Sequence, residues 1–229
     1  MATTSKEKTP KPLRFVGIIP ARYASTRFPG KPLVDIGGKT MIQRVYEQVS
    51  KTLSDVYVAT DDQRIYDAVL AFGGNVILTS NQHKSGTDRC YEAFSRLEEW
   101  FDVVINIQGD EPFIQPEQIK TLQGCFEEPD IQIATLARAF TEKDGYEGLN
   151  NPNSPTLVIN KQNEALYFSR SVIPYHRGKE TNEWIALHPY YKHVGIYAYR
   201  ADVLHQLIML PQSALEMAES LEQLRWLEN

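Results

Sequence analysis

Cysteine is scarce in this chain, with two residues, Cys90 and Cys125, among 229. They lie far apart and show none of the short spacings of a zinc site. Two cysteines also cannot form the disulfide framework that stabilises small secreted proteins. We therefore expect reduced, partly buried thiols in a cytoplasmic protein.

Long apolar runs are absent too, since no stretch approaches the ~20 residues that a membrane-spanning helix needs. Residues 1–14 (MATTSKEKTPKPLR) are polar and basic and lack the apolar segment of a secretory signal. We expect them to form a flexible tail, and we expect no membrane insertion. The formal net charge of −5 offers no general basic surface, so we expect no nucleic-acid partner.

Both glycine-rich phosphate-binding fingerprints are missing. Gly30-Lys31 is followed by Pro32 rather than Ser or Thr, which excludes a Walker A loop. No G-x-G-x-x-G motif is present either, and this argues against a nicotinamide-dependent dehydrogenase.

The chain has instead a cationic loop after an apolar segment. Phe15–Ile19 is typical of a strand buried on both faces, and Pro20, which has no N–H to donate, is expected to end its pairing. Cations and hydroxyls that can bind polyphosphate oxygens follow before Leu33. They are Arg22, Ser25, Thr26, Arg27 and Lys31. The alternative is a solvated basic loop without a ligand.

Strand-like and helix-like segments alternate through the first half of the chain. This alternation predicts an α/β fold with a mainly parallel sheet covered on both sides. Strands are expected at 15–19, 56–60, 76–78 and 103–107. Helices are expected from a Thr40–Gln43 capping box, from a cap at Asp61 or Asp62 to Gly73-Gly74, and from the 81–88 loop towards Trp100.

Ligands of such sheets bind beyond the carboxyl ends of the strands. Gln108-Gly109-Asp110-Glu111-Pro112 follows the 103–107 strand directly. A carboxylate at that place can hold Mg²⁺ beside a triphosphate, and Asp110 is the candidate ligand. The alternative is that Asp110 caps a turn. In the loop 83–89, Thr87 and Asp88 either bind a ligand or cap the next helix.

The alternation stops near Asp144. Segments 157–160 and 165–168 flank a turn and predict a hairpin that ends near Arg170. A strand is expected at 194–199, with His193, Gly195, Tyr197 and Tyr199 on one of its faces. Antiparallel strands of this kind often form a second lobe over a substrate, and the alternative for His193 is a structural role. A terminal helix is predicted with an apolar stripe at Leu215, Met217, Ala218, Leu221 and Leu224. Glu219, Glu222 and Gln223 are expected off that stripe. A solvated acidic face is the alternative to a binding role for them.

Six separated motifs then identify a family. They are IPARYASTRFPGKPL, HKSGTDR, NIQGDEP, ALYFSRSVIP, HVGIYAYR and SLEQLRWLEN. In content and order they closely resemble the 3-deoxy-manno-octulosonate cytidylyltransferases (CMP-Kdo synthetases), over about Phe15 to Asn229. The related CMP-sialic acid synthetases carry a Gly-Gly-Ser-Lys-type run where this chain has Tyr23–Arg27.

The resemblance implies a Rossmann-like, GT-A-like nucleotidyltransferase fold of three layers, mostly parallel, with a smaller antiparallel substrate and dimerisation lobe. It implies one domain over 15–229 after the tail 1–14. Within it, a nucleotide-binding core would span about 15–140 and a sugar-binding and dimer lobe about 150–229. Family members are commonly homodimers, and we expect one here.

The resemblance also implies the reaction. CMP would pass from CTP to the anomeric hydroxyl of the eight-carbon sugar acid Kdo, with release of pyrophosphate, for lipopolysaccharide biosynthesis. Arg22, Arg27 and Lys31 would hold the triphosphate, and Asp110 the Mg²⁺ cofactor. Residues near the nucleotide would be Ser25, Thr26, Ser85, Gly86, Thr87, Arg89 and Gln108. Residues for the sugar acid would be Arg170, His193, Tyr197, Glu222 and Gln223.

One departure concerns the second metal ligand. Family members continue past SLEQLR with a strand and a Gly-x-Asp-Thr-Pro-type segment, whose Asp also binds the metal. These 229 residues contain no such segment, so we expect weak or no activity from them and full activity from a longer parent. Two alternatives stay open: a CMP-activating synthetase for another keto sugar acid, of sialic or pseudaminic type, and a nucleotide-binding protein without turnover.

Overall fold

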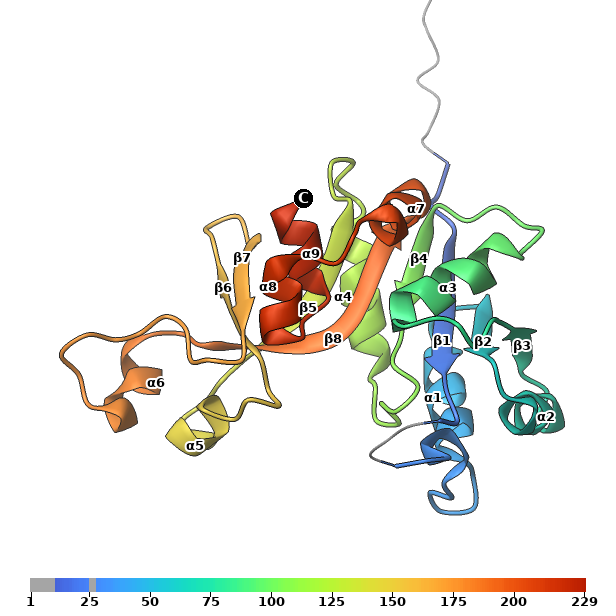
Figure 1. Ribbon diagram of the computed structural model, residues 1–229, viewed down its shortest axis with the longest axis horizontal. Helices are drawn as coiled ribbons and strands as arrows, with labels where there is room; N and C mark the ends of the chain where they lie inside the picture. The colour runs from blue at the N-terminus through green and yellow to red at the C-terminus, as the bar shows by residue number, and fades with distance from the viewer. Residues whose placement is uncertain (1–10, 25–27) are drawn as a thin grey trace, which may run out of the picture.

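One sheet of eight strands runs through the computed structural model, which describes residues 11–24 and 28–229 (Figure 1). In chain order the strands are β1 (Phe15–Ala21), β2 (Val56–Thr60), β3 (Asn75–Leu78), β4 (Val103–Asn106), β5 (Ile133–Ala139), β6 (Thr156–Ile159), β7 (Ala165–Ser169) and β8 (Tyr191–Arg200). Along the sheet the order is β3-β2-β1-β4-β8-β6-β7, and β5 also pairs with β8. Strands β1 to β4 are parallel, whereas β8 is antiparallel to β4, β5 and β6.

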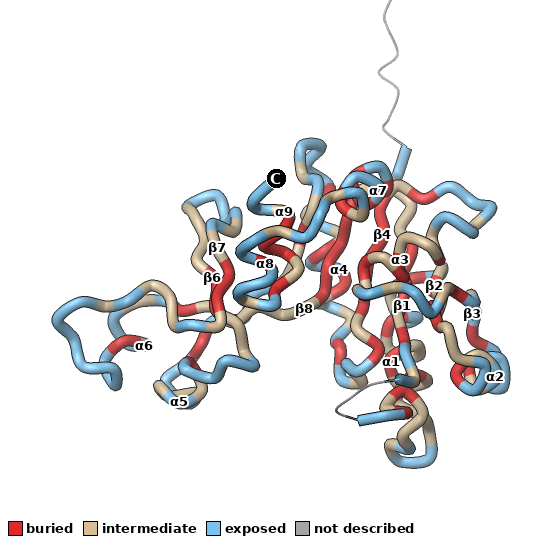
Figure 2. The backbone as a smooth tube through the Cα atoms, viewed as in Figure 1, coloured by how far each residue is buried: buried red, intermediate tan, exposed pale blue. Residues whose placement is uncertain are grey.

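Helices cover both faces of this sheet. In chain order the helices of the described chain are α1 (Met41–Val49), α2 (Gln63–Ala71), α3 (Gly86–Ser95), α4 (Pro116–Cys125), α5 (Gly145–Leu149), α6 (Trp184–Leu187), α7 (Ala201–Met209), α8 (Ala214–Glu219) and α9 (Gln223–Glu228). Successive residues of β1 point to opposite faces, so Ile19 packs with α1, α2 and α4 while Ile18 packs with α3 and α7. Figure 2 shows the buried residues concentrated in β1 and β4, between these layers.

The predicted α/β fold with a mostly parallel sheet in three layers is therefore confirmed. The strand predicted at 56–60 has the bounds of β2, and the next two predictions differ from β3 and β4 by one residue. The hairpin prediction is confirmed by the antiparallel pair β6–β7. Within the described ranges, no helix combines the length and apolar content needed to cross a membrane.

Pro20 does not end β1, so that prediction is wrong. It pairs with Ala59 of β2, and the strand continues for one more residue. The backbone N–H of Gly17 faces β2, whereas Ile18 O faces the other way and accepts from Ile107 N. Because alternate residues face alternate neighbours, Pro20 has the orientation of Ile18, on the side where pairing with β4 has already stopped. Its missing N–H therefore removes no hydrogen bond to β2.

Helix starts follow the predicted chemistry only in part. Thr40 caps α1, accepting from Gln43 N at 3.3 Å, but the Gln43 side chain donates to Glu47 instead of completing a capping box. Asp62 rather than Asp61 caps α2. Trp100 does not belong to α3, which ends at Ser95, and it is exposed in the following loop.

The predicted terminal helix is in fact two short helices, so its continuous apolar stripe is wrong. Ser220 adopts a left-handed conformation, with φ of 51°, and ends α8 before α9 begins. After this bend, Leu221 and Leu224 are buried against the β6–β7 hairpin. Leu215 and Met217, predicted in the stripe, are exposed.

Residues 140–190 form an arm at the end of the sheet away from β3 (Figure 1). The arm contains α5, α6 and the β6–β7 hairpin, and it has a small aromatic core around Trp184 and Tyr190. Helices α4 to α7 and strand β5 had no sequence prediction. Because β8 pairs with both β4 and β6, the sheet is continuous, and the boundary predicted at residues 140–150 stays a prediction.

A buried ion pair joins α8 to α9. Arg225 Nε donates to Glu216 Oε2 at 2.8 Å, and both side chains are 9% exposed. The hydrogen bond from Arg225 holds the pKa of the Glu216 carboxyl below its ordinary value. Removing one partner leaves the other charge buried without compensation.

Arg225→Met should therefore lower the free energy of unfolding by about 3–5 kcal/mol, measured by urea denaturation with circular dichroism. Lys39→Ala is the control, because the Lys39–Glu47 pair is exposed on both sides and should contribute no more than about 1 kcal/mol. Equal losses in the two variants would contradict a stabilising role for the buried pair.

Candidate active site

The loops after β1 and β4 meet at one edge of the sheet, because these strands are parallel neighbours. There Lys31 Nζ lies 2.5 Å from Asp110 Oδ2, although the two residues are 79 positions apart. Both side chains are partly exposed, at 37% and 47%. A cation and a carboxylate that were predicted from separate motifs therefore share one site.

Gly30 sets the place of Lys31. It has a left-handed conformation, with φ of 72°, and its N–H donates to Tyr23 O at 2.9 Å. A Cβ at this position would lie 3.1 Å from the Tyr23 ring. Both the positive φ and this close approach therefore favour glycine. The Arg64 guanidinium covers that ring, 3.3 Å from its centroid, and is paired with Asp62 at the start of α2. These contacts fix the end of the cationic loop.

Gly109 sets the place of Asp110 in a similar way. A Cβ on Gly109 would lie 2.9 Å from Pro20 O, closer than side chains approach a backbone oxygen. Glycine thus lets the acidic loop pack directly against the end of β1. The pairing of Lys31 with Asp110 depends on this close approach of the two loops.

Ser85 and its neighbours begin α3. The Ser85 hydroxyl accepts from Asp88 N at 3.0 Å and the Asp88 carboxylate accepts from Ser85 N. Ser85 is therefore the N-cap and Asp88 completes its capping box, whereas Thr87 takes no part in it. Gly86 is the first residue of the helix. The Thr87 hydroxyl donates to Glu222 Oε2 at 2.9 Å and ties this turn to the C-terminal segment.

Arg89, which was predicted to lie near the nucleotide, is buried and bonded to groups of the protein. Its side chain is 1% exposed and donates to Asp61 at 2.9 Å and to Thr79 at 2.6 Å. These partners follow β2 and β3, so the guanidinium holds α3 against the ends of two strands. The geometry favours this structural role over direct contact with a nucleotide.

His193 and Tyr197 lie together on β8, with ring centroids 5.3 Å apart, as their predicted common face requires. The His193 Nε2 is 3.1 Å from Thr135 Oγ1, and the ring packs edge-on against Phe168. Burial lowers the pKa of His193 to about 4 and raises that of the Tyr197 hydroxyl. At pH 7 both side chains are therefore neutral hydrogen-bonding groups.

Glu222 and Gln223 do not lie on a solvated face, which was the alternative to a binding role. Burial raises the pKa of Glu222, whose carboxylate accepts from Thr87. Gln223 is 6% exposed, and its Nε2 has no hydrogen-bond partner among the described residues. Glu219 likewise turns inward, accepting from the Ser169 hydroxyl at 2.7 Å.

Arg170 is held by three backbone carbonyls. It donates through Nε to Glu219 O at 2.6 Å, through Nη1 to Pro152 O at 2.7 Å and through Nη2 to Ser220 O at 3.1 Å. A guanidinium has five N–H groups, so these bonds leave two for a ligand. Arg170 also lines an open cavity of about 510 Å³ with Tyr175 and Trp184 of the arm.

Two more of the predicted residues lie just after β1 and β4. Arg22 is exposed directly after β1, and Gln108 is half-buried at the start of the acidic loop. Ser25, Thr26 and Arg27 lie outside the described residues.

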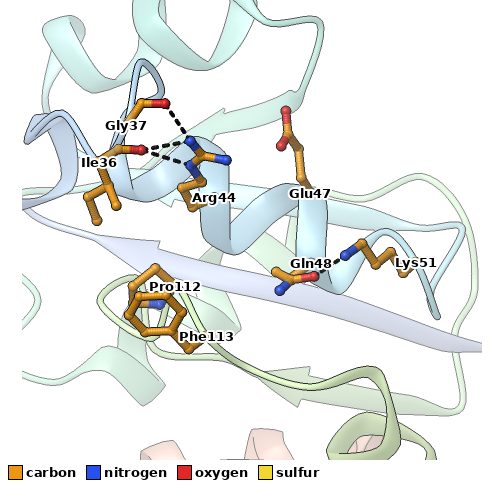
Figure 3. Close-up of a pocket in the computed structure, with 8 residues that line it drawn as sticks. All are labelled: Ile36, Gly37, Arg44, Glu47, Gln48, Lys51, Pro112 and Phe113. Atoms are coloured by element: carbon orange, nitrogen blue, oxygen red, sulfur yellow. Dashed lines mark hydrogen bonds between the residues drawn. The ribbon is translucent and has the colours of Figure 1, made fainter.

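A cavity of about 370 Å³ adjoins the acidic loop on its other flank (Figure 3). Pro112 and Phe113 face Ile36 and Arg44 across it, and Arg44 donates to Ile36 O at 2.7 Å. No predicted site residue lines this cavity, so it is separate from the Lys31–Asp110 pair.

Sequence reasoning missed four supporting roles at the site, those of Tyr23, Asp61, Arg64 and Thr79. Tyr23 lies in the IPARYASTRFPGKPL motif, between Arg22 and Arg27. This position is the feature of the sequence that could have indicated its contact with a cation. The partners of Arg89 come from two other loops, so no local spacing could have identified them.

The acidic loop fits a magnesium ion of the kind bound through substrate phosphates. Mg²⁺ is usually held by one or two carboxylates, with phosphates and waters completing its shell. Asp110 offers one accessible carboxylate beside Lys31. Across residues 11–24 and 28–229 no three His, Cys, Asp or Glu side chains form a metal-binding group, so an all-protein metal cage is not what these residues build.

His193 should make stability depend on pH. Its folded pKa of about 4 lies below the ordinary 6.5, so between these values the unfolded chain binds more protons. Its contribution is complete above pH 6.5 and is lost as the pH falls towards 4. The stability difference between the wild type and His193→Gln should therefore be constant above pH 6.5 and shift against the wild type below it.

Urea denaturation at pH 7.5, 6.5 and 5.5 measures this difference. His205→Gln is the matched control, because His205 is exposed. A difference for His193→Gln that does not vary with pH would contradict burial of a neutral imidazole.

The comparisons with known proteins agree with this geometry. A family model described as cytidylyltransferase matches residues 16–229. The chain is 65% identical to the 3-deoxy-manno-octulosonate cytidylyltransferase of Parabacteroides distasonis, with 95% of this chain and 87% of the relative covered. It is 50% identical to the enzyme of the same name from Escherichia coli, covering 91% and 81%.

Solved structures place the fold in the same group. The structure of CMP:2-keto-3-deoxy-manno-octonic acid synthetase complexed with CTP matches with a TM-score of 0.85 and 48% identity, over 94% of this chain and 86% of that one. A 4-diphosphocytidyl-2C-methyl-D-erythritol synthase from Anaerococcus prevotii matches with a TM-score of 0.55 and 11% identity, over 93% and 84%, and shows a common fold alone. This chain therefore belongs to the 3-deoxy-manno-octulosonate cytidylyltransferase family.

Proposed function

We propose that the protein joins CTP and 3-deoxy-manno-octulosonate to give CMP-Kdo and pyrophosphate, supplying an activated sugar acid for lipopolysaccharide biosynthesis. The observation that carries the proposal is the meeting of Lys31 and Asp110 at the carboxyl edge of the sheet. Relatives that are 50–65% identical bear this enzyme name, and a related structure contains CTP.

Catalysis of this reaction depends on positioning and on neutralising charge. The sugar hydroxyl attacks the α-phosphorus in line with the departing pyrophosphate, and negative charge grows on the phosphate oxygens. Lys31 binds these oxygens through its ammonium group. Arg22 and Arg27 add guanidinium contacts from the same loop, and Gly86 and Thr87 bring the first turn of α3 to the ligand.

Asp110 is the residue that would hold Mg²⁺, and magnesium dependence is part of the proposal. When bound, the ion supplies charge neutralisation at the triphosphate. The Asp110–Lys31 pair is exposed and contributes little to stability, so its partners can turn to a ligand at low cost.

The sugar acid is bound on the other side of the nucleotide by groups of β8, by Arg170 directly after β7 and by residues at the start of α9. Neutral His193 and Tyr197 hydrogen-bond its hydroxyls, as do Glu222 and Gln223. Arg170 receives the carboxylate through its two remaining N–H groups. This division places charge recognition at Arg170 and hydroxyl recognition on β8 and α9.

Assembly and location complete the proposal. The arm has a core of few residues and leaves Tyr175 74% exposed, which supports a contact between two copies through this arm and hence a homodimer. Both cysteines are free thiols, which supports assigning the reaction to the reducing cytoplasm.

Pyrophosphate release tests the function directly. Measured with the longer parent protein, CTP should give turnover that requires the octulosonic acid and Mg²⁺, while UTP, ATP and GTP should give at most a small fraction of that rate. Release that does not depend on the sugar acid, or a preference for another nucleotide, would contradict the proposed reaction.

Lys31→Ala and Asp110→Asn should each slow turnover by at least ~100-fold, the scale of lost electrostatic stabilisation. Lys39→Ala, which removes a cation from the same region that pairs with Glu47, should leave the rate unchanged. Near-normal rates for either site variant would refute its role.

A further inference from the structure

Asn106 is the last residue of β4 and lies in the middle of the sheet. It pairs with Ile18 on one side and with Tyr197 on the other. Its side chain is 1% exposed, and its Oδ1 has no hydrogen-bond partner among the described residues.

An unpaired amide oxygen is out of place in this strand. Every other residue from Val103 to Ile107 is apolar and fully buried. Buried polar atoms are nearly always hydrogen-bonded, and a missing partner costs more than an apolar side chain of the same shape would. The amide is therefore best explained by a partner that binds from outside the protein.

The surroundings of Asn106 indicate the chemistry of that partner. Asn106 shares its face of the sheet with Tyr197 and with the first turn of α3, where Gly86 packs over Pro20. From that turn the Thr87 hydroxyl reaches the Glu222 carboxylate.

Gln223, the residue after Glu222 and the first of α9, offers a donor that complements the Asn106 acceptor. Gln223 Nε2 is a buried donor without a partner in the described part of the chain, whereas Asn106 Oδ1 is a buried acceptor. A hydroxyl both donates and accepts, so a polyhydroxylated ligand can satisfy both amides.

We infer that Asn106 is a further substrate-contacting residue, whose carboxamide oxygen accepts a hydrogen bond from a hydroxyl of the sugar acid. The inference rests on the proposed function, since it concerns the same site. Asn106 comes four residues before Asp110 and lies opposite Tyr197, so it stands between the phosphate-binding loops and the sugar-binding strand.

Asn106→Leu keeps the size of the side chain and removes its polar atoms. In steady-state assays with each substrate varied separately, kcat/KM for the octulosonic acid should fall about 10- to 100-fold, the loss of one or two hydrogen bonds. KM for CTP should stay within about threefold. Asn106→Ser, which keeps an oxygen acceptor, should recover part of the loss.

Asn75→Leu is the matched control. It makes the same change at the opposite edge of the sheet, where the Asn75 amide donates to Val56 O, and it should leave both kinetic constants unchanged. Thermal melting of all three variants establishes that they are folded.

Sugar-acid analogues that each lack one hydroxyl sharpen the test. The analogue that lacks the hydroxyl bound by Asn106 should have a low kcat/KM with the wild type. Asn106→Leu should not lower this kcat/KM further, because the hydrogen bond is already absent. The inference is wrong if the variants keep the wild-type kcat/KM for the sugar acid. It is also wrong if every analogue lowers kcat/KM by the same factor in the wild type and in Asn106→Leu. Asn106 would then be a core residue bonded to an internal water. Absence of sugar-dependent turnover in the longer parent protein, in which these kinetic assays are made, would instead overturn the proposed function, and the inference with it.

Discussion

The site depends on one ion pair, Lys31 with Asp110, made by loops that only the sheet brings together. Strands β1 and β4 are adjacent and parallel, so the segments that follow them leave the sheet at the same edge. An exposed pair of this kind contributes about 0.2–1 kcal/mol to stability. Its arrangement is therefore better explained by ligand binding than by folding.

Behind this edge, charged side chains are buried and form ion pairs with other side chains. Arg89 binds Asp61 and Thr79, and Arg225 binds Glu216. Such groups are costly to bury alone, and pairing makes them rigid supports for α3 and for the C-terminal helices. The molecule thus separates accessible charges, which can exchange partners, from buried charges, which cannot.

The parallel core could be predicted because its strands are nearly pure apolar runs and its helices have apolar stripes. Lys31 and Asp110 could be predicted to meet, since the rule on carboxyl ends depends only on strand order. Pro20 misled the prediction because its effect depends on which neighbour its nitrogen faces. Ser220 misled it because a single left-handed residue broke a pattern that looked continuous. The burial of Arg89 could not be predicted at all, since its partners are contributed by other loops.

Crystals grown with CTP and Mn²⁺ in place of Mg²⁺ offer the most direct measurement of the central claim. The anomalous signal should lie within about 2.5 Å of an Asp110 carboxylate oxygen, with the triphosphate between the metal and Lys31. A metal peak away from Asp110, or a triphosphate bound at another edge of the sheet, would contradict the account.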